Sequence, residues 1–336
     1  MTIFLNRLWY EGQARWALLL LWPLSCLYRL ICWLRRLRYR FLYRQPDCAV
    51  PIIVIGNLTV GGTGKTPLTM ALLEVLLKHG LKPGVIARGY QSQAEYASEP
   101  VLIASHHTAA EVGDEALLIF KTMQVPVAVN HQRVQAVAAL LAQHPDLDMI
   151  LSDDGLQHLK LPRALEIVVV DGERQCGNGH LLPAGPLREP RSRLQQVDFV
   201  VQSGIDFKLV PQELHALQAG HSPQSLNFLT GKTIHAVAGI GHPARFFALL
   251  KKLGAEIIPH IFPDHHAFAQ LDFKDFQESL IVMTAKDAIK CEGFHLPQAY
   301  YLNTYVKLDA VFEDAFWQKL RYIVPREVND GDSVHE

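Results

Sequence analysis

Apolar residues are arranged in two different ways along this chain. In residues 16–34 they form one nearly continuous run, interrupted by Pro23, Ser25 and Arg29. A membrane-spanning helix needs about 20 mostly apolar residues, so this run predicts a helix of borderline length for a span. After Asp47 the apolar residues fall into short runs that end at Gly, Asp or Ser, a pattern typical of strands.

The short apolar runs predict the buried strands of a parallel sheet, because a strand covered on both faces lacks alternating polar positions. In the first two thirds of the chain these runs are 51–57, 84–89, 147–155, 165–172 and 197–204. Helical spacing of apolar residues predicts helices at 68–79, 114–123 and 133–143. Strands that alternate with helices through short turns predict an α/β fold with helices on both faces of the sheet.

The turn after the first predicted strand carries the most specific motif in the chain. Its residues are Thr59, Val60, Gly61, Gly62, Thr63, Gly64, Lys65 and Thr66. Glycines let backbone N–H groups approach phosphate oxygens, and the N-terminus of the next helix favours anions, so this context predicts a P-loop. We expect Lys65 to contact the β- and γ-phosphates and the Thr66 hydroxyl to bind Mg²⁺. Thr59 stands where the usual pattern has its first glycine.

A P-loop needs an acidic partner at the end of a neighbouring strand to hold the metal ion. Asp153 and Asp154 follow a predicted strand, and one carboxylate can bind Mg²⁺ while the other orients a lysine or a water. The alternative is that both aspartates cap the next turn. The segment 284–288 has Lys286 beside Asp287 but lacks the Asn of a guanine-specific motif, which favours ATP as the nucleotide.

The regular alternation of strands and helices stops at residues 205–230 and then resumes. Apolar runs at 232–241 and 280–288 predict a second, smaller α/β unit. The predicted organisation is a membrane-associated helical segment at 1–46, a P-loop core at 47–204, a linker at 205–230, a smaller C-terminal α/β domain at 231–326 and a polar tail at 327–336.

Charge is distributed unevenly between the head of the chain and its body. Residues 1–50 hold eight arginines against Glu11 and Asp47, a charge of +6, and the total of −1 leaves −7 for the remainder. A basic, apolar head favours a membrane surface as the partner, because bound nucleic acid would require a basic stripe on the folded body. The five cysteines show no metal-ligand spacing, which predicts reduced thiols and a cytoplasmic body.

The head allows two modes of membrane attachment. Trp9, Trp16, Trp22 and Trp33 are suited to the membrane interface, and an arginine-rich stretch follows at 35–44. A single span would place these arginines in the cytoplasm, whereas a monotopic helix would lay them on anionic headgroups. Either mode predicts the inner membrane at its cytoplasmic face. The alternative is a core helix packed on a soluble domain.

An ordered set of short motifs resembles the tetraacyldisaccharide 4′-kinases of Gram-negative bacteria. The motifs lie at 55–67, 87–90, 113–115, 153–158, 181–190, 239–247, 262–268 and 284–288. Gln91 departs from the pattern, where a glycine is expected. The resemblance implies transfer of the ATP γ-phosphate to the 4′-hydroxyl of tetraacyldisaccharide 1-phosphate, which yields the lipid A precursor lipid IVA. It also implies a smaller C-terminal domain hinged over the nucleotide.

The resemblance further implies that Asp114 is the catalytic base and that His265 pairs with it. From the residues alone, Asp114 would be read as a helix N-cap, since it follows Gly113 at the start of a predicted helix. His265 is preferred to His266 because Asp264 directly precedes it and can fix its tautomer.

Four further residues are weaker candidates for substrate contact. Arg88 and Arg133 are expected to clamp phosphates, since guanidinium groups suit them. Arg188 and Glu189 are expected to line the acceptor or nucleotide side. The partner is then an acylated disaccharide lipid at the membrane, with neither nucleic acid nor an obligatory protein partner inferred.

Three other functions are compatible with parts of the pattern. A membrane-tethered P-loop NTPase switch would hydrolyse nucleotide without a lipid acceptor. A lipid-binding scaffold with a degenerate nucleotide site is disfavoured by Lys65 and Thr66. A kinase of another glycolipid would keep the same chemistry with a different acceptor.

Overall fold

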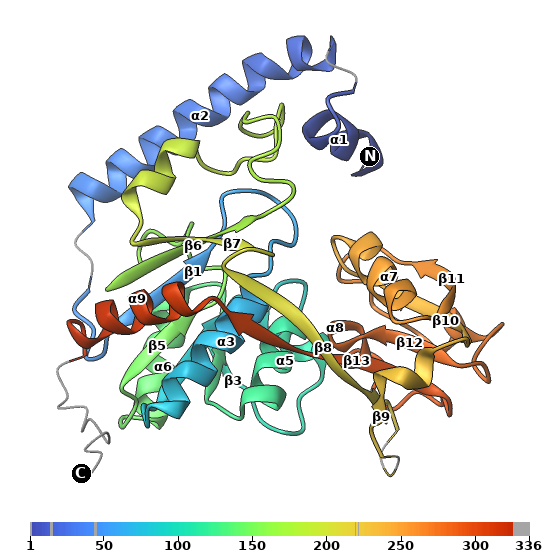
Figure 1. Cartoon of the computed structure of the whole chain (residues 1–336). Coiled ribbons are helices and arrows are strands. Elements are labelled where there is room, and N and C mark those ends of the chain that lie inside the picture. The colour runs from blue at the N-terminus through green and yellow to red at the C-terminus, as the bar shows by residue number, and fades with distance from the viewer. Residues whose placement is uncertain (1, 14–15, 44–45, 219, 221, 325–336) are drawn as a thin grey trace, which may run out of the picture.

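The computed structural model describes residues 2–13, 16–43, 46–218, 220 and 222–324, and the predicted tail at 327–336 lies outside them. The chain forms a core lobe and a small lobe, joined by one continuous sheet (Figure 1). In the core lobe the strand order is β7-β6-β1-β5-β2-β4-β3, parallel except where β3 pairs with β4. The mixed α/β fold and its P-loop arrangement confirm the predicted fold class.

The core lobe contains the strands and helices predicted from the sequence, together with two short strands and one short helix that were not predicted. The strands are β1 (Ile52–Gly56), β2 (Pro83–Ala87), β3 (Val101–Leu102), β4 (Val127–Val129), β5 (Met149–Ser152), β6 (Leu165–Asp171) and β7 (Phe199–Ser203). The helices are α3 (Lys65–Lys78), α4 (Ala109–Val112), α5 (Asp114–Met123) and α6 (Arg133–Gln143), with short 3₁₀ turns at Gln93–Tyr96 and Arg191–Gln196. Strands β1, β2, β4, β5 and β6 are buried along their whole length, as a sheet covered on both faces requires.

The small lobe is built from the C-terminal part of the sheet. Its elements are β9 (Gln224–Ser225), a 3₁₀ turn at Leu226–Leu229, β10 (Thr233–Ala238), α7 (Pro243–Lys252), β11 (Glu256–Ile261), a 3₁₀ turn at Gln270–Phe273, β12 (Ile281–Thr284) and α8 (Ala285–Ala288). Strands β11, β10, β12 and β13 are parallel in that order. Two long antiparallel strands, β8 (Phe207–Ala216) and β13 (Ala299–Leu308), form the ribbon that joins the lobes (Figure 1).

The segment 205–230, expected to be a linker, contains one of the two strands of this ribbon. Strand β8 occupies Phe207–Ala216, although Pro211 interrupts its apolar pattern. Its pairing with β13 shifts register between Asn303 and Thr304, opposite the proline. A β-bulge tolerates a residue that lacks an N–H donor, so the strand continues through a position at which the sequence suggests a break.

The chain returns to the core lobe after the small lobe. Helix α9 (Ala310–Arg321) lies beside α3 in Figure 1 and falls inside the range 231–326 drawn for the smaller domain. Phe312, Phe316 and Leu320 join the apolar cluster that contains Leu68 and Leu72 of α3. The core lobe therefore includes the last described helix. The chain leaves the core lobe along β8 and returns to it along β13.

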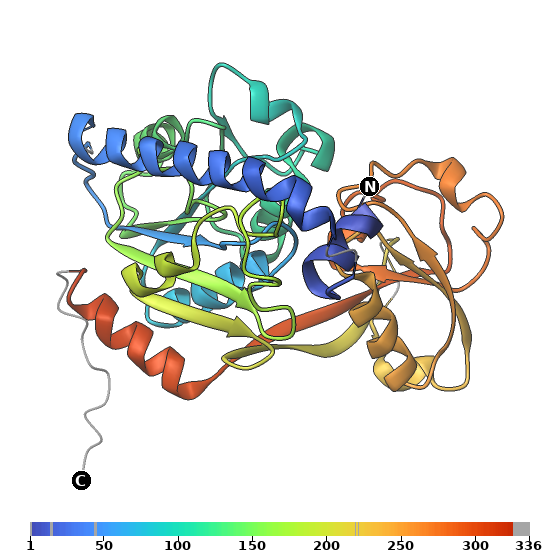
Figure 2. The ribbon, with the colours of Figure 1, turned by 90° about the horizontal axis from the view of Figure 1, so that it is seen from above.

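The head of the chain forms α1 (Thr2–Tyr10) and the 27-residue helix α2 (Trp16–Leu42). Figure 2 shows α2 lying lengthwise across the core lobe. Among the described helices, α2 is long and apolar enough to cross a membrane, and an 18-residue window within it has a mean hydropathy of 1.8. Only 11% of that apolar window is buried, so a core helix of a soluble protein does not describe it.

Packing of α9 makes a testable prediction for stability. Phe316 is fully buried, so we expect Phe316→Ala to lower the free energy of unfolding by about 3–5 kcal/mol through lost burial and a cavity. Val311→Ala on the same helix should change it little, because Val311 is 77% exposed. Denaturant titration of the detergent-purified variants measures the difference. Equal effects would show that α9 does not dock on the core lobe.

Candidate active site

The phosphate loop lies between β1 and α3 and its backbone needs glycine. Gly61 and Gly64 have φ values of 100° and 94°, which L side chains rarely adopt, and a Cβ at Gly64 would lie 3.0 Å from the Phe207 ring. The segment that leads into the loop is braced from outside, because Val60 N donates to Pro186 O (2.9 Å) and Thr59 forms a bridge with Leu187. Thr59, where a glycine is usual, is thus held by strand-like pairing.

The first turn of α3 faces a buried aspartate at the end of the neighbouring strand β5. Thr66 Oγ1 donates to Asp153 Oδ2 (3.1 Å), and Thr69 Oγ1 donates to Asp153 Oδ1 (3.2 Å). Burial, together with the charge of Glu115, raises the pKa of Asp153 to about 6. A hydroxyl and a carboxylate held this close are oxygen ligands of the kind Mg²⁺ prefers. Thr69 was missed by the sequence analysis, although it lies one turn beyond Thr66.

The second aspartate, Asp154, turns toward cations. Its Oδ1 lies 3.6 Å from Lys65 Nζ and 3.5 Å from Arg188 Nη1. Burial tends to raise the pKa of Asp154, but the charges of Lys65, Arg188 and Arg133 outweigh it and hold the pKa below its ordinary value. The two adjacent aspartates therefore have different surroundings, one beside hydroxyls and the other beside cations.

Arg133 contacts the backbone beside the aspartate pair. Its side chain is buried, and it donates from Nη1 to Asn130 O (2.9 Å) and from Nη2 to Asp153 O (3.3 Å). Burial lowers the pKa of Arg133 to about 10. This geometry supports the backbone of the aspartate pair, which differs from the expected phosphate clamp.

The loop has room and unpaired polar atoms for a magnesium-bound nucleotide. A Cβ added at Gly61 or Gly62 would meet nothing within 4 Å, so the backbone there faces open space. Buried Thr63 Oγ1 lacks a hydrogen-bond partner among the described residues. Those residues also hold no group of three His, Cys, Asp or Glu side chains suited to a metal. A cation here would need phosphate oxygens as further ligands, which fits Mg²⁺ on a nucleotide.

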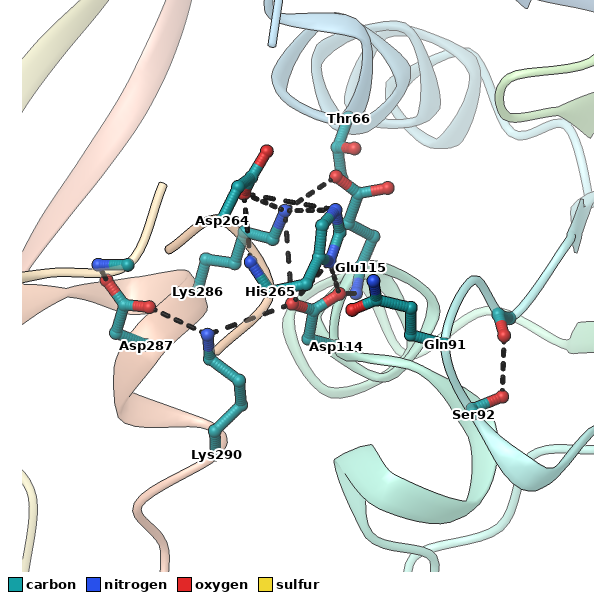
Figure 3. A network of polar contacts seen from close by, with 12 residues as sticks. Thr66, Gln91, Ser92, Asp114, Glu115, Asp264, His265, Lys286, Asp287 and Lys290 are labelled. Atoms are coloured by element: carbon teal, nitrogen blue, oxygen red, sulfur yellow. Dashed lines mark hydrogen bonds and ion pairs between the residues drawn. The ribbon is translucent and has the colours of Figure 1, made fainter. Parts of the chain in front are cut away.

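A carboxylate–histidine pair forms across the boundary between the lobes (Figure 3). Asp114 opens α5 of the core lobe, and His265 follows β11 of the small lobe. His265 Nδ1 donates to both oxygens of Asp114, at 3.2 and 3.0 Å. Gly113 occupies the N-cap position of α5, so Asp114 is not the cap residue, and its carboxylate faces the histidine while Oδ1 also accepts from Glu115 N (2.8 Å).

Electrostatics favour opposite charges on this pair. Burial tends to raise the pKa of Asp114, but the His265 hydrogen bond and the charges of Lys286 and Lys290 bring it below its ordinary value. Burial tends to lower the pKa of His265, but the bond to Asp114 outweighs it and the pKa is raised. At neutral pH Asp114 is therefore a carboxylate.

A lysine that the sequence analysis did not assign lies beside the pair. Lys286 Nζ is 2.9 Å from Glu115 Oε1, 3.6 Å from Asp264 Oδ1 and 3.9 Å from Asp114 Oδ2. Figure 3 shows its ammonium between these carboxylates. The adjacency of Lys286 and Asp287 was noted in the sequence only as a nucleotide-specificity signal. Lys286 is far from Asp114 in the sequence, so the sequence alone does not predict the contact between them.

Two other candidate side chains, His266 and Arg88, have partners outside the Asp114–His265 pair. His266 Nε2 pairs with Asp272 Oδ2 at 3.0 Å, away from Asp114. Arg88 is 56% exposed, and its Nε lies 2.8 Å from the buried carboxylate of Glu95. That exposure leaves Arg88 open to a ligand.

Glu189 faces the apolar helix α2 rather than the phosphate loop. It forms an ion pair with Arg36 of α2, and Gln157 Nε2 donates to its other oxygen (3.1 Å). On the same helix, Tyr28 Oη donates to the backbone carbonyl of Arg188 (3.1 Å). Helix α2 therefore contacts the segment that presents Arg188 to Asp154.

The fold and this geometry define a class of protein. A phosphate loop after a central parallel strand, an adjacent acidic pair and a core-lobe carboxylate that pairs with a histidine of a second lobe are the parts of a P-loop phosphotransferase. The model of the tetraacyldisaccharide-1-P 4′-kinase family matches residues 17–324. The chain therefore belongs to the tetraacyldisaccharide 4′-kinase family, which confirms the resemblance carried by its motifs.

Individual relatives agree over nearly the whole chain. It is 44% identical to the tetraacyldisaccharide 4′-kinase of Hahella chejuensis over 325 residues, covering 93% of this chain and 95% of that one. It is 40% identical to the enzyme of the same name from Methylobacillus flagellatus, covering 97% and 98%. The crystal structure of LpxK from Aquifex aeolicus in complex with ATP is similar, with a TM-score of 0.72 at 27% identity, covering 91% and 99%.

The Asp114–His265 pair predicts a particular dependence of stability on pH. The raised pKa of His265 means that its contribution is complete below 6.5 and is lost as pH rises through the raised value. The lowered pKa of Asp114 means that its contribution is complete above 3.8 and is lost as pH falls through the lowered value. We expect His265→Gln to destabilise most in roughly the pH 4–6.5 window and progressively less above it.

Thermal unfolding at a series of pH values measures this difference. His131→Gln is the control, because His131 is exposed and lies outside the pair. A loss of stability in His265→Gln that is the same at every pH would contradict the ion pair.

Proposed function

We propose that this chain transfers the γ-phosphate of ATP to the 4′-hydroxyl of tetraacyldisaccharide 1-phosphate and releases lipid IVA and ADP. Membership in the kinase family supports the acceptor and the reaction class. The similar ATP complex supports the nucleotide. The observation that carries the proposal is the contact of Asp114 with His265 across the lobe boundary (Figure 3), because it supplies a base to a site with a phosphate loop.

The nucleotide is held by the loop 59–66. Its backbone N–H groups and Lys65 bind the phosphates, and the glycines let the chain approach them closely. Thr66 and Asp153, whose oxygens face one another, would hold Mg²⁺, while Asp154 orients Lys65 and Arg188. When bound, the metal neutralises charge that develops on the phosphates.

Asp114 accepts the proton of the 4′-hydroxyl as that oxygen forms its bond to the γ-phosphorus. The bond from the γ-phosphorus to the bridging oxygen breaks, and ADP takes the electron pair. His265 holds the orientation of Asp114 through the paired hydrogen bonds. A positioned base of this kind contributes about 10²–10⁴-fold to the rate.

The four weaker candidates have separate tasks. Arg188, held beside Asp154, stabilises phosphate charge, and the exposed Arg88 contacts a substrate phosphate. Arg133 acts indirectly by supporting the backbone of Asp153. Glu189 holds α2 in place through Arg36.

The predicted units act as two lobes that close over the nucleotide. The unit 47–204, completed by α9, binds the nucleotide, and the smaller unit within 231–326 brings His265 to it. The β8–β13 ribbon is the connection about which they close. This scheme needs no additional protein partner.

The head attaches the enzyme to the cytoplasmic face of the inner membrane as a monotopic helix. Ser25 and Arg35 of α2 donate to backbone carbonyls of Leu181 (2.8 Å) and Gln157 (3.0 Å), which supports a helix docked along the core lobe. A helix docked over that length does not also cross the bilayer. Its exposed leucines and tryptophans face the acyl chains, where the acylated acceptor is confined.

Transfer of label to lipid tests the reaction. Detergent-purified protein with Mg²⁺, γ-labelled ATP and tetraacyldisaccharide 1-phosphate should label the lipid. Lys65→Ala should abolish transfer, and Asp114→Asn should lower kcat by about 10²–10⁴-fold with ATP binding retained. Release of phosphate from ATP without labelled lipid would instead support the NTPase switch. Label on a different glycolipid only would change the acceptor.

Thiol labelling from one side of the membrane tests the topology. In a cysteine-free background, Trp16→Cys and Leu42→Cys place single thiols at the two ends of α2. On inside-out vesicles, a membrane-impermeant maleimide should label both positions if the helix is monotopic. Labelling of position 42 alone would establish a span.

A further inference from the structure

We propose that Lys286 is a positioning residue for Asp114, and that its ammonium fixes the base relative to the phosphate loop by joining the two lobes. The inference rests on the proposed role of Asp114 as base. Lys286 lies on α8 of the small lobe, whereas Asp114 and Glu115 open α5 of the core lobe. The link is therefore made only when the lobes are together.

The ammonium of Lys286 lies among three carboxylates. Glu115 and Asp114 belong to the core lobe, and Asp264 belongs to the small lobe next to His265. The Lys286 side chain is 17% exposed, so the interaction with Glu115 at 2.9 Å is only weakly screened by water. One cation thus holds together anions that would otherwise repel across the boundary.

Helix α8 is anchored tightly within its own lobe. Asp287 is fully buried, and it accepts hydrogen bonds from Gly239 N (2.9 Å) and Thr284 Oγ1 (2.7 Å). Lys290 Nζ lies 2.8 Å from Asp287 Oδ1 and 4.0 Å from Asp114 Oδ2. A lysine projecting from so fixed a turn can hold a residue on the other lobe in place.

Asp287 also holds the segment of the small lobe that lies against the phosphate loop. Gly239 begins the segment 239–241, and a Cβ at Gly241 would lie 3.2 Å from Gly62 N. The small lobe thus meets the core lobe at the phosphate loop through this segment and at Asp114 through Lys286. Both contacts trace back to Asp287, so they set the separation of base and loop together.

Removal of the ammonium would leave the site with excess negative charge. The charged groups that face Asp114 are His265, Lys286 and Lys290, with Glu115 adjacent on α5 and Asp264 beyond the histidine. Without Lys286, only His265 and Lys290 would oppose three carboxylates. The boundary would then open slightly, and the pKa of Asp114 would rise because an opposite charge is lost.

Steady-state kinetics of three variants test the proposal. Lys286→Met should lower kcat by roughly 10²-fold, the cost of about 1 Å of misplacement, while KM for ATP stays near native. The acid limb of its kcat profile should move to higher pH. Lys286→Arg should recover most of the activity, since a guanidinium keeps the charge. Lys121→Met is the matched control, because Lys121 on α5 pairs with Glu292 of the small lobe.

Several results would overturn the proposal. Native kcat and pH profile in Lys286→Met would remove any positioning role, and an equal loss in Lys121→Met would reduce the effect to general adhesion between lobes. Thermal unfolding and binding of a fluorescent ATP analogue check that each variant folds. If Lys286→Met does not fold, Lys286→Gln carries the same test. Failure of the native chain to label lipid would instead contradict the proposed function.

Discussion

A buried carboxylate remains an anion only where cations are brought to it, and Asp114 meets its cations across the boundary between two lobes. His265, Lys286 and Lys290 all belong to the small lobe. The charge state of Asp114 therefore depends on the contact between the two lobes. The long β8–β13 ribbon and the buried Asp287 matter for this charge state, because they determine where the cations are held relative to Asp114.

A second chain of contacts joins the apolar helix α2 to the phosphate site. Helix α2 reaches Glu189 through Arg36 and the Arg188 backbone through Tyr28, and the Arg188 side chain reaches Asp154. Polar side chains of α2 contact the core lobe, while large apolar side chains such as Leu19, Leu20 and Trp22 remain exposed. One helix thus combines an exposed apolar surface with contacts that brace the segment next to Asp154.

The fold was largely predictable because its signals are local. Buried parallel strands appear as continuous apolar runs, and the glycine-rich loop requires positive φ angles wherever it occurs. The parts that escaped prediction depend on distant partners. Strand β8 tolerates Pro211 only because β13 accommodates a bulge, and α9 joins the core lobe only after the chain has built the small one.

The sequence by itself determined the phosphate loop, the acidic pair, the apolar head and, through its ordered motifs, the family. Each of these is encoded in short stretches whose residues indicate their chemistry without knowledge of their partners in space. Only the tertiary structure decided that Arg133 donates to the Asp153 backbone, that Glu189 faces α2 and that Lys286 lies beside Asp114. The physical reason is that charge pairing acts over a few ångströms in space, and sequence separation carries no information about that distance.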